Sequence, residues 1–264
     1  MSLTKRSLLL ALGLSSALLS MGSVQAQEAL AQIEKSKVVK IGVPADYPPY
    51  GFVGLDLKPI GLDIDVANLI GAKLGATVEL VPVVSANRIP YLQTKKIDLI
   101  VSTLGKNEER VKIIDFSAAY APFYQGVFAL KSLPIKSFDD LAGKSVAVTR
   151  GAMEDEMLGK VAPASTQIQR FEDQAATTAA FAAGQTQVIA TSVSNIGVLS
   201  RKSPNLGIEY KLLLRDSPCF VGIAKGEDAL LKKVNEIVLA AKADGTLEAL
   251  SQKWLKRGTG DLPL

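Results

Sequence analysis

Short β-rich runs and amphipathic helical segments alternate along this chain, and the same alternation occurs twice. In the first part, apolar residues recur at helical spacing between Leu62 and Leu74. Apolar, β-branched runs flank that segment and predict strands, and Asn87 is a suitable cap for a second helix. The expected order is strand 38–43, helix 61–74, strand 77–83, helix 87–93 and strand 97–102. This order predicts an open α/β sheet.

The pattern restarts after a break near Ala121 and Pro122. The second series is expected as strand 145–149, helix 152–160, strand 167–171, helix 174–183 and strand 187–191. An apolar run over 219–224 and two amphipathic helices follow. The apolar faces of these helices must be buried against one of the lobes. Sheets of this kind bind ligands beyond the carboxyl ends of their strands. Two similar lobes would therefore surround one shared cleft for a small molecule.

The first 26 residues are typical of a secretory targeting segment. Lys5 and Arg6 precede an apolar stretch from Leu8 to Leu19, and small residues lead to an expected cleavage after Ala26. A membrane anchor is the alternative, but the apolar stretch is short for a span of about 20 residues and is diluted by Ser15, Ser16, Ser20 and Gly22. We therefore expect export to the periplasm and removal of this segment.

Composition argues against several classes of enzyme site. The chain has no histidine and a single cysteine, Cys219, so it lacks the commonest general base, the commonest metal ligand and any internal disulfide. The mature chain shows no phosphate-binding loop, dinucleotide fingerprint, nucleophile elbow or EF-hand, and no cofactor is expected. Removal of Lys5 and Arg6 lowers the formal net charge from +4 to +2, which does not suggest nucleic acid as a partner.

One loop concentrates groups that bind an anion. Ser102 and Thr103 end a predicted strand, Gly105 follows, and Arg110 lies a few residues further on. Hydroxyls, backbone amides and a guanidinium in one loop can hold a carboxylate by charge-assisted hydrogen bonds, with the arginine offering a bidentate fork. Helix capping by the hydroxyls and a surface ion pair for the arginine are the alternative interpretation.

Motifs in seven segments follow one another along nearly the whole mature chain. They are 42–52 (GVPADYPPYGF), 61–66 (GLDIDV), 89–100, 109–110, 114–117 (IDFS), 139–144 (DDLAGK) and 245–254. In this order they resemble the family 3 periplasmic solute-binding proteins, which feed amino acids and related solutes to ABC importers. The resemblance implies a two-lobed α/β fold, the type II periplasmic binding protein fold, with the ligand cleft between two open sheets. It implies one lobe from 27–122 plus 219–264, a second from 123–218, a membrane permease as partner and a monomer.

The resemblance also implies roles for particular residues. The ring of Tyr47 would cover the ligand, Ser102 and Thr103 would supply polar contacts, and Arg110 would hold the α-carboxylate. The alternatives are a packing role for Tyr47 and a solvated ion pair for Arg110.

The second lobe departs from the family pattern. The usual Gly-Thr-Thr is Gly151-Ala152-Met153 here, so backbone amides at a helix start are the remaining anion donors. The aspartate that commonly accepts the ligand's α-ammonium aligns with Ser192, and without it a buried ammonium lacks its charge partner. Glu154 or Asp155 would substitute for that aspartate, or the ligand would present its ammonium elsewhere or carry none.

Two further arginines favour an acidic ligand. Arg88 lies in an Asn-Arg-Ile-Pro segment similar to one in acidic amino acid binders of the family, and Arg150 directly precedes Gly151. Solvated surface charge is the alternative for both. Together with the serine at 192, these arginines indicate glutamate, aspartate or a dicarboxylate relative as the ligand.

A competing hypothesis from another class is an exported enzyme on the same fold. Relatives of the family include cyclohexadienyl dehydratases, and a fold by itself does not fix a function. Such an enzyme needs a carboxylic acid in the cleft to protonate a leaving hydroxyl, and Glu154 and Asp155 are the candidates.

Overall fold

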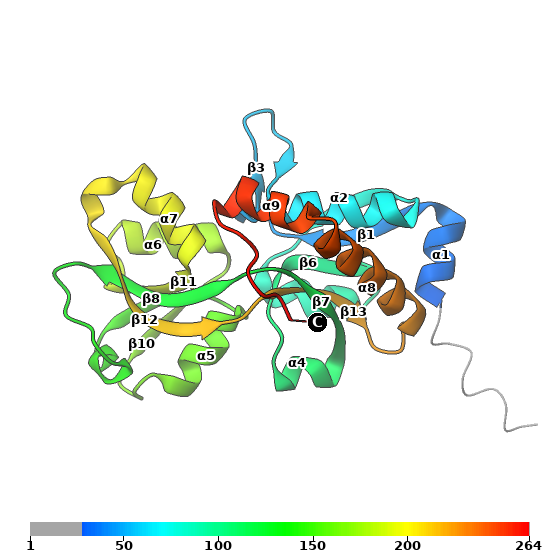
Figure 1. The fold of residues 1–264 in the computed structure, drawn as a ribbon. Helices are drawn as coiled ribbons and strands as arrows, with labels where there is room; N and C mark the ends of the chain where they lie inside the picture. The colour runs from blue at the N-terminus through cyan, green and yellow to red at the C-terminus, as the bar shows by residue number, and fades with distance from the viewer. Residues whose placement is uncertain (1–27, 264) are drawn as a thin grey trace, which may run out of the picture.

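A computed structural model describes residues 28–263 of the chain, and the expected targeting segment, 1–26, lies outside them. Two five-stranded sheets form two lobes that lie side by side, each with helices packed on it (Figure 1). No helix within 28–263 is long and apolar enough to cross a membrane. The architecture is the two-lobed α/β fold that the resemblance implied.

The sheet of lobe 1 has the strand order β5-β1-β6-β13-β7. Its strands are β1 (Val38–Val43), β5 (Thr77–Pro82), β6 (Leu99–Leu104), β7 (Ile114–Ala121) and β13 (Cys219–Ala224). β1 pairs in parallel with β5 and β6, whereas β13 pairs antiparallel with β6 and β7. Every residue of β6 is buried, as expected for a central strand covered on both faces.

Six helices belong to lobe 1 within the described residues. They are α1 (Glu28–Ser36), α2 (Leu62–Leu74), α3 (Arg88–Gln93), α4 (Glu108–Ile113), α8 (Asp228–Ala243) and α9 (Thr246–Leu255). α2 ends at Gly75, which has a φ of 64° that glycine adopts without steric cost. α8 buries Leu230, Val234 and Ile237 in the lobe 1 core, so the two amphipathic tail helices do cover a lobe.

The sheet of lobe 2 has the strand order β10-β9-β11-β8-β12. Its strands are β8 (Tyr124–Leu130), β9 (Ser145–Thr149), β10 (Gln167–Phe171), β11 (Val188–Ser192) and β12 (Ile208–Asp216). β9 pairs in parallel with β10 and β11, and β8 pairs antiparallel with β11 and β12. The helices of this lobe are α5 (Met153–Val161), α6 (Gln174–Ala182) and α7 (Val193–Lys202).

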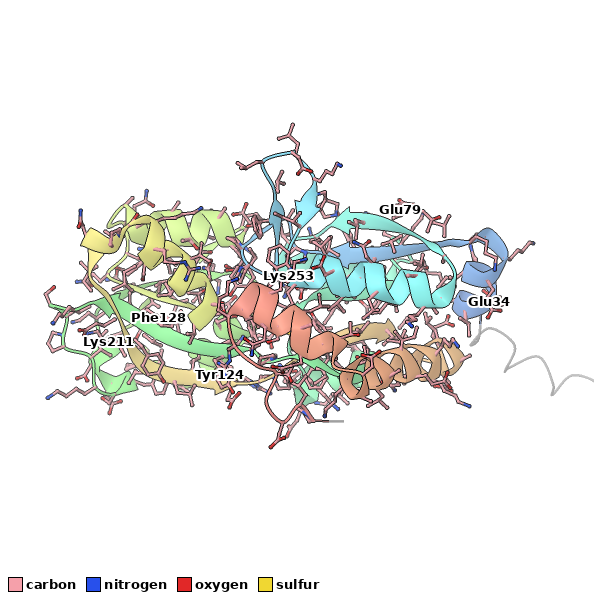
Figure 2. The ribbon with its side chains drawn as sticks, turned by 45° about the horizontal axis from the view of Figure 1, so that its top comes forward. Glu34, Glu79, Tyr124, Phe128, Lys211 and Lys253 are labelled. Atoms are coloured by element: carbon pink, nitrogen blue, oxygen red, sulfur yellow. The ribbon has the colours of Figure 1, made fainter. Side chains whose placement is uncertain are left out.

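A small three-stranded sheet projects from lobe 1 between the two lobes. It consists of β2 (Asp46–Tyr47), β3 (Gly51–Val53) and β4 (Pro59–Ile60). Its start carries Asp46 and Tyr47 to the face of lobe 2, where Asp46 Oδ2 accepts a hydrogen bond of 2.8 Å from the backbone of Ala175. In Figure 2, Glu34 and Lys253 mark lobe 1, and Phe128 and Lys211 mark lobe 2.

The chain passes between the lobes twice, once between β7 and β8 and once between β12 and β13. The two crossing segments contact each other, because the Ser217 N–H donates to the Phe123 carbonyl at 3.0 Å. The lobe boundaries at residues 122 and 219 fall at these crossings and stay a prediction. Paired crossings of this kind are the usual hinge for closure around a ligand.

Most elements expected from the sequence are present within one or two residues. Strands 38–43, 145–149 and 167–171 are confirmed to the residue. Other elements were not predicted, namely α1, α4, β7, β8, α7, β12 and the small projecting sheet. β7, β8 and β12 are the antiparallel strands that lead into or out of the crossings, and no intervening helix marks them in the sequence.

Candidate functional site

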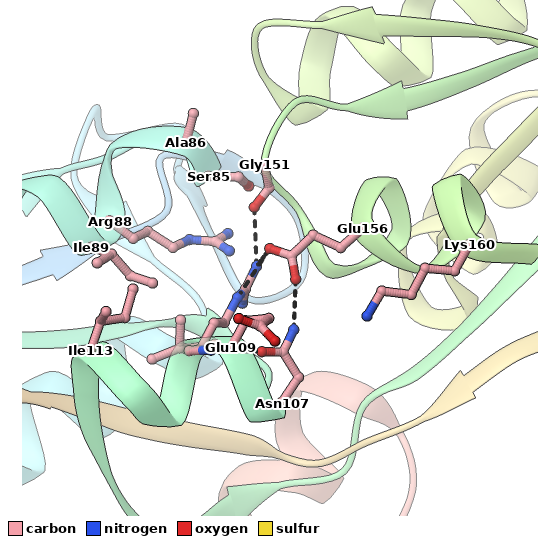
Figure 3. A pocket seen from close by; sticks show the side chains of 12 residues that line it. Ser85, Ala86, Arg88, Ile89, Asn107, Glu109, Ile113, Gly151, Glu156 and Lys160 are labelled. Atoms are coloured by element: carbon pink, nitrogen blue, oxygen red, sulfur yellow. Dashed lines mark hydrogen bonds and ion pairs between the residues drawn. The ribbon is translucent and has the colours of Figure 1, made fainter.

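A cavity of about 490 Å³ opens between the lobes, beside the carboxyl end of β6 (Figure 3). Lobe 1 lines it with residues of α3, α4 and the segments before them, and lobe 2 lines it with the start and the outer face of α5. Figure 3 shows Arg88 reaching in from one side and Glu156 from the other. The cavity therefore lies where two facing lobes were expected to share a cleft.

Arg88 is a buried cation at this cavity. Arg88 is the first residue of α3, is 4% exposed and lines the cavity. Nε donates to Ser102 Oγ and Nη2 donates to Thr103 Oγ1, both at 3.2 Å. Burial and the nearby Arg110 lower the pKa of Arg88. Within residues 28–263 no carboxylate forms an ion pair with Arg88, so its charge faces the cavity without a direct counterion.

Asp63 holds the Ser102–Thr103 segment from behind. Its Oδ2 accepts from the Thr103 N–H and its Oδ1 accepts from the Tyr120 hydroxyl, both at 2.8 Å. Burial raises the pKa of Asp63 to about 7, although these hydrogen bonds and Arg88 favour the charged form. Thr103 has a φ of 44°, a left-handed conformation that is strained for a β-branched residue. Strain of this kind persists only where neighbouring groups fix the backbone, as Asp63 does here.

Arg110 spans the two lobes. Asn107 caps α4 by accepting from the Arg110 N–H at 2.8 Å, and this places the guanidinium at the cavity. Nη1 donates to the Gly105 carbonyl and Nη2 donates to the Gly151 carbonyl, each at 3.2 Å. Arg110 also binds the carboxylate of Glu156, with Nη2 2.6 Å and Nε 3.2 Å from Oε1. In this structure a lobe 2 carboxylate thus occupies the fork of the arginine.

Gly105 and Gly151 lie at close contacts between the lobes. A Cβ on Gly105 would lie 2.8 Å from Cε of Met153, and a Cβ on Gly151 would lie 2.9 Å from Cα of Ala86. The amides expected to bind an anion are already used. Gly151 N–H donates to Asp155 Oδ2, and Ala152 N–H donates to the Thr149 carbonyl, both at 3.1 Å.

Tyr47 and Ser192 meet at the other end of the interface. Tyr47 is fully buried, and its hydroxyl lies 3.2 Å from Thr191 Oγ1 and accepts from the Ser192 N–H at 3.2 Å. Ser192 Oγ caps α7 by accepting from the Asn195 N–H at 3.1 Å. The ring of Tyr47 packs against Tyr50 and Phe123, with centroid distances of 5.5 and 6.3 Å. In this structure Tyr47 bridges the lobes directly.

One expected site residue lies elsewhere. Arg150 is exposed, and its Nε lies 3.8 Å from Glu172 Oε2, with both side chains more than half exposed. Arg150 therefore matches the alternative of a solvated surface charge and does not belong to the candidate site. Asp155 is likewise engaged away from the cavity, because Arg170 Nε donates to its Oδ1 at 2.8 Å.

Three lobe 2 residues at the interface are additional candidates, of which the sequence pointed only to Glu154. Glu156, which binds Arg110, was not predicted; its only signal was a third acid in the first turn of α5. Glu154 was an open candidate, and it is 3% exposed. Gln125 was missed, although an amide within the otherwise apolar strand β8 was a visible signal; it is 1% exposed. Within residues 28–263, no group of three or more His, Cys, Asp or Glu side chains is placed to hold a metal ion.

Comparison with known proteins adds an independent line of evidence. A family model described as bacterial extracellular solute-binding proteins, family 3, matches residues 39–257. The ABC transporter glutamine-binding protein GlnH of Bacillus subtilis is 29% identical over 235 residues, which cover 87% of this chain and 85% of that protein. The L-cystine-binding protein TcyJ of Escherichia coli is 27% identical over 230 residues, which cover 85% of each chain.

The solved structures agree with the sequence relatives. A mutant of the arginine-binding protein ArgBP from T. maritima superposes with a TM-score of 0.81 at 27% identity. The match covers 87% of this chain and 100% of that one. The overall fold of this chain is therefore shared with a protein of known structure.

Proposed function

The chain belongs to the family 3 bacterial extracellular solute-binding proteins, and from this premise we propose that its ligand is an acidic amino acid, glutamate or aspartate. It is an amino acid solute-binding protein of ABC transport, as its named relatives are. Those relatives are transport binding proteins, and this chain is one of them rather than an enzyme. Named relatives bind glutamine, cystine or arginine, so the acidic ligand rests on this chain's own residues.

The observation that carries the proposal is the buried charge of Arg88, which forms no ion pair within residues 28–263, although Glu154 and Asp63 lie near enough to favour its charged form. Its hydrogen bonds go to two neutral hydroxyls, and it lines the cavity between the lobes. A buried guanidinium without a counterion is costly, and an anionic ligand group would remove that cost. A carboxylate on the ligand side chain supplies such a group.

Arg110 supplies the second anion site. Its contact with Glu156 supports this, because one carboxylate oxygen accepts from Nη2 at 2.6 Å and from Nε at 3.2 Å. We infer that the α-carboxylate of the ligand takes this place and that Glu156 moves away. An amino acid with two carboxylates would then match two buried guanidinium groups.

Delivery follows from closure of the lobes. The open form admits the ligand, contacts from both lobes stabilise the closed form, and the closed surface is what a membrane permease recognises. In this proposal the chain is exported to the periplasm after cleavage behind Ala26 and acts as a monomer.

Calorimetric titration of protein freed of ligand by unfolding and refolding tests the proposal. L-glutamate or L-aspartate should bind more tightly than L-glutamine, L-arginine or L-cystine. Arg88→Gln should weaken binding of the acidic ligand at least about 30-fold, because truncating one partner of a buried charge pair costs 2–5 kcal/mol. Arg150→Gln, the same change at an exposed arginine, should leave binding unchanged. Tight binding of L-arginine with no acidic ligand would refute the acidic assignment.

A further inference from the structure

Two acceptor oxygens at the lobe interface have no hydrogen-bond donor. They are Oε1 of Glu154 and Oε1 of Gln125, and both atoms are buried within the described part of the chain. The residues are 3% and 1% exposed, so bulk water does not solvate them. A buried acceptor left unpaired costs about 1–3 kcal/mol, and more where the group is charged. Two such oxygens in one place indicate a missing donor.

Both residues lie beside the position where the family's aspartate is absent. Gln125 on β8 is the direct antiparallel partner of Ser192 on β11. Glu154 lies in the first turn of α5, and the Gln125 side chain is close enough to lower its pKa. Burial nevertheless raises the pKa of Glu154 overall. The two acceptors thus lie near each other on the lobe 2 side of the interface.

Glu154 also lies near the lobe 1 residues expected to surround the ligand. Gly151, three residues before it, accepts a hydrogen bond from Arg110 Nη2 at 3.2 Å, and Glu154 is 3% exposed. Arg88 and Arg110 lower the pKa of Glu154, and Glu154 raises the pKa of Tyr47, in keeping with this placement. Its buried carboxyl group therefore lies on the side of α5 that faces the lobe interface.

We propose that Glu154 and Gln125 accept hydrogen bonds from the α-ammonium of the bound amino acid, replacing the aspartate that Ser192 lacks. The inference rests on the proposed amino acid ligand and adds a specificity residue to that site. An ammonium group has three donors and no acceptor, which matches two orphan acceptors of which one carries charge. The charges also balance. Arg88, Arg110 and the ammonium oppose Glu154 and the two carboxylates of an acidic amino acid.

The test compares amino acids with analogues that lack only the α-amine, by calorimetric titration. The pairs are L-glutamate with glutarate and L-glutamine with glutaramate. Within the pair that it binds, the native protein should bind the amino acid more tightly than the amine-free analogue. Glu154→Gln should weaken binding of that amino acid at least about 100-fold while changing the affinity for its amine-free analogue less than fivefold. Gln125→Leu should weaken binding of the amino acid, but not of its analogue, by about tenfold, since this change removes one neutral acceptor. Glu172→Gln, a matched change at an exposed glutamate, should change neither.

The outcomes separate this inference from the proposed acidic ligand. Selective loss of the amino acid in Glu154→Gln supports the ammonium site. Equal loss of both members of a pair, or no loss, overturns it, and thermal melting of each variant shows whether it remains folded. If the native protein prefers L-glutamine to L-glutamate, the acidic assignment fails, and the glutamine pair still tests Glu154. If glutarate binds more tightly than L-glutamate to the native protein, the ammonium site is refuted and the two-arginine site stands.

Discussion

The groups that meet at the lobe interface differ in charge, although Glu109 of lobe 1 and Lys160 of lobe 2 also line the cavity. Lobe 1 contributes two buried guanidinium groups, Arg88 and Arg110, whereas lobe 2 contributes the carboxyl groups of Glu154 and Glu156. The lobe 1 groups are fixed by hydrogen bonds to their own lobe. On the lobe 2 side, Glu154 has an orphan oxygen and Glu156 relies on lobe 1 for its partners.

This difference shows in the contacts between the lobes. Arg110 of lobe 1 pairs with Glu156 of lobe 2, and Tyr47 adds a neutral bridge to Ser192. A zwitterion placed between the lobes can satisfy both signs, with its carboxylates toward lobe 1 and its ammonium toward lobe 2. The sorting of charge by lobe therefore favours ligands that carry both signs, in a fixed orientation.

Removal of Arg110 should have the largest effect, because both the proposed ligand contact and the Arg110–Glu156 contact between the lobes depend on it. Arg110→Gln should weaken amino acid binding more than 100-fold, since deleting one partner of the proposed buried pair between arginine and ligand carboxylate costs about 3–5 kcal/mol. Calorimetric titration measures the loss. Arg150→Gln is the control, and an affinity within threefold of the native protein for Arg110→Gln would contradict the role of lobe 1 as the anion-binding side.

The second prediction concerns the acid that supports the lobe 1 arginines. Burial raises the pKa of Asp63 to about 7, from 3.8 in the unfolded chain, so the folded protein holds a proton there that the unfolded chain releases. The resulting contribution to stability is full below pH 3.8 and is lost as the pH rises through about 7. This group alone should lower the free energy of unfolding by up to roughly 4 kcal/mol between pH 4 and pH 8.

Urea denaturation at a series of pH values measures this contribution. Asp63→Asn should flatten the pH dependence between pH 4 and pH 8 relative to the native protein, whatever its stability at one pH. Asp56→Asn changes an exposed carboxylate on the projecting sheet and should leave the slope unchanged. An equally steep slope in Asp63→Asn would show that Asp63 is charged throughout, and that lobe 1 is not pre-organised by a protonatable group.

Much of the fold was predictable because helical and strand periodicities are local signals. Strand β1 and strands β9 and β10 were located to the residue. The antiparallel strands β7, β8 and β12 were not, because their pairing joins segments distant in sequence and is set by the crossings between lobes. Local periodicity carries no information about such partners.

The candidate site divides in the same way. Ser102, Thr103 and Arg110 follow a strand end, where a ligand loop is expected, and the structure brings them together with Arg88. Contacts across the cleft, such as Arg110 with Glu156, depend on how the lobes close and have no sequence signal. Arg150 shows the opposite failure. It directly precedes Gly151, which lines the cavity, but its own side chain is exposed and lies near Glu172.

Replacement of Glu156 should produce the smallest change, and in the opposite direction. Its carboxylate competes for the fork of Arg110, and its side chain is 35% exposed, so the contact is worth about 1 kcal/mol or less. Glu156→Gln should therefore tighten amino acid binding by up to about fivefold and should also let the empty lobes separate. Titration measures the first effect, and small-angle scattering of the ligand-free protein measures the second. Glu236→Gln, on an exposed face of α8, should do neither. Weaker ligand binding in Glu156→Gln would mean that lobe 2 uses Glu156 to hold the ligand rather than to take its place.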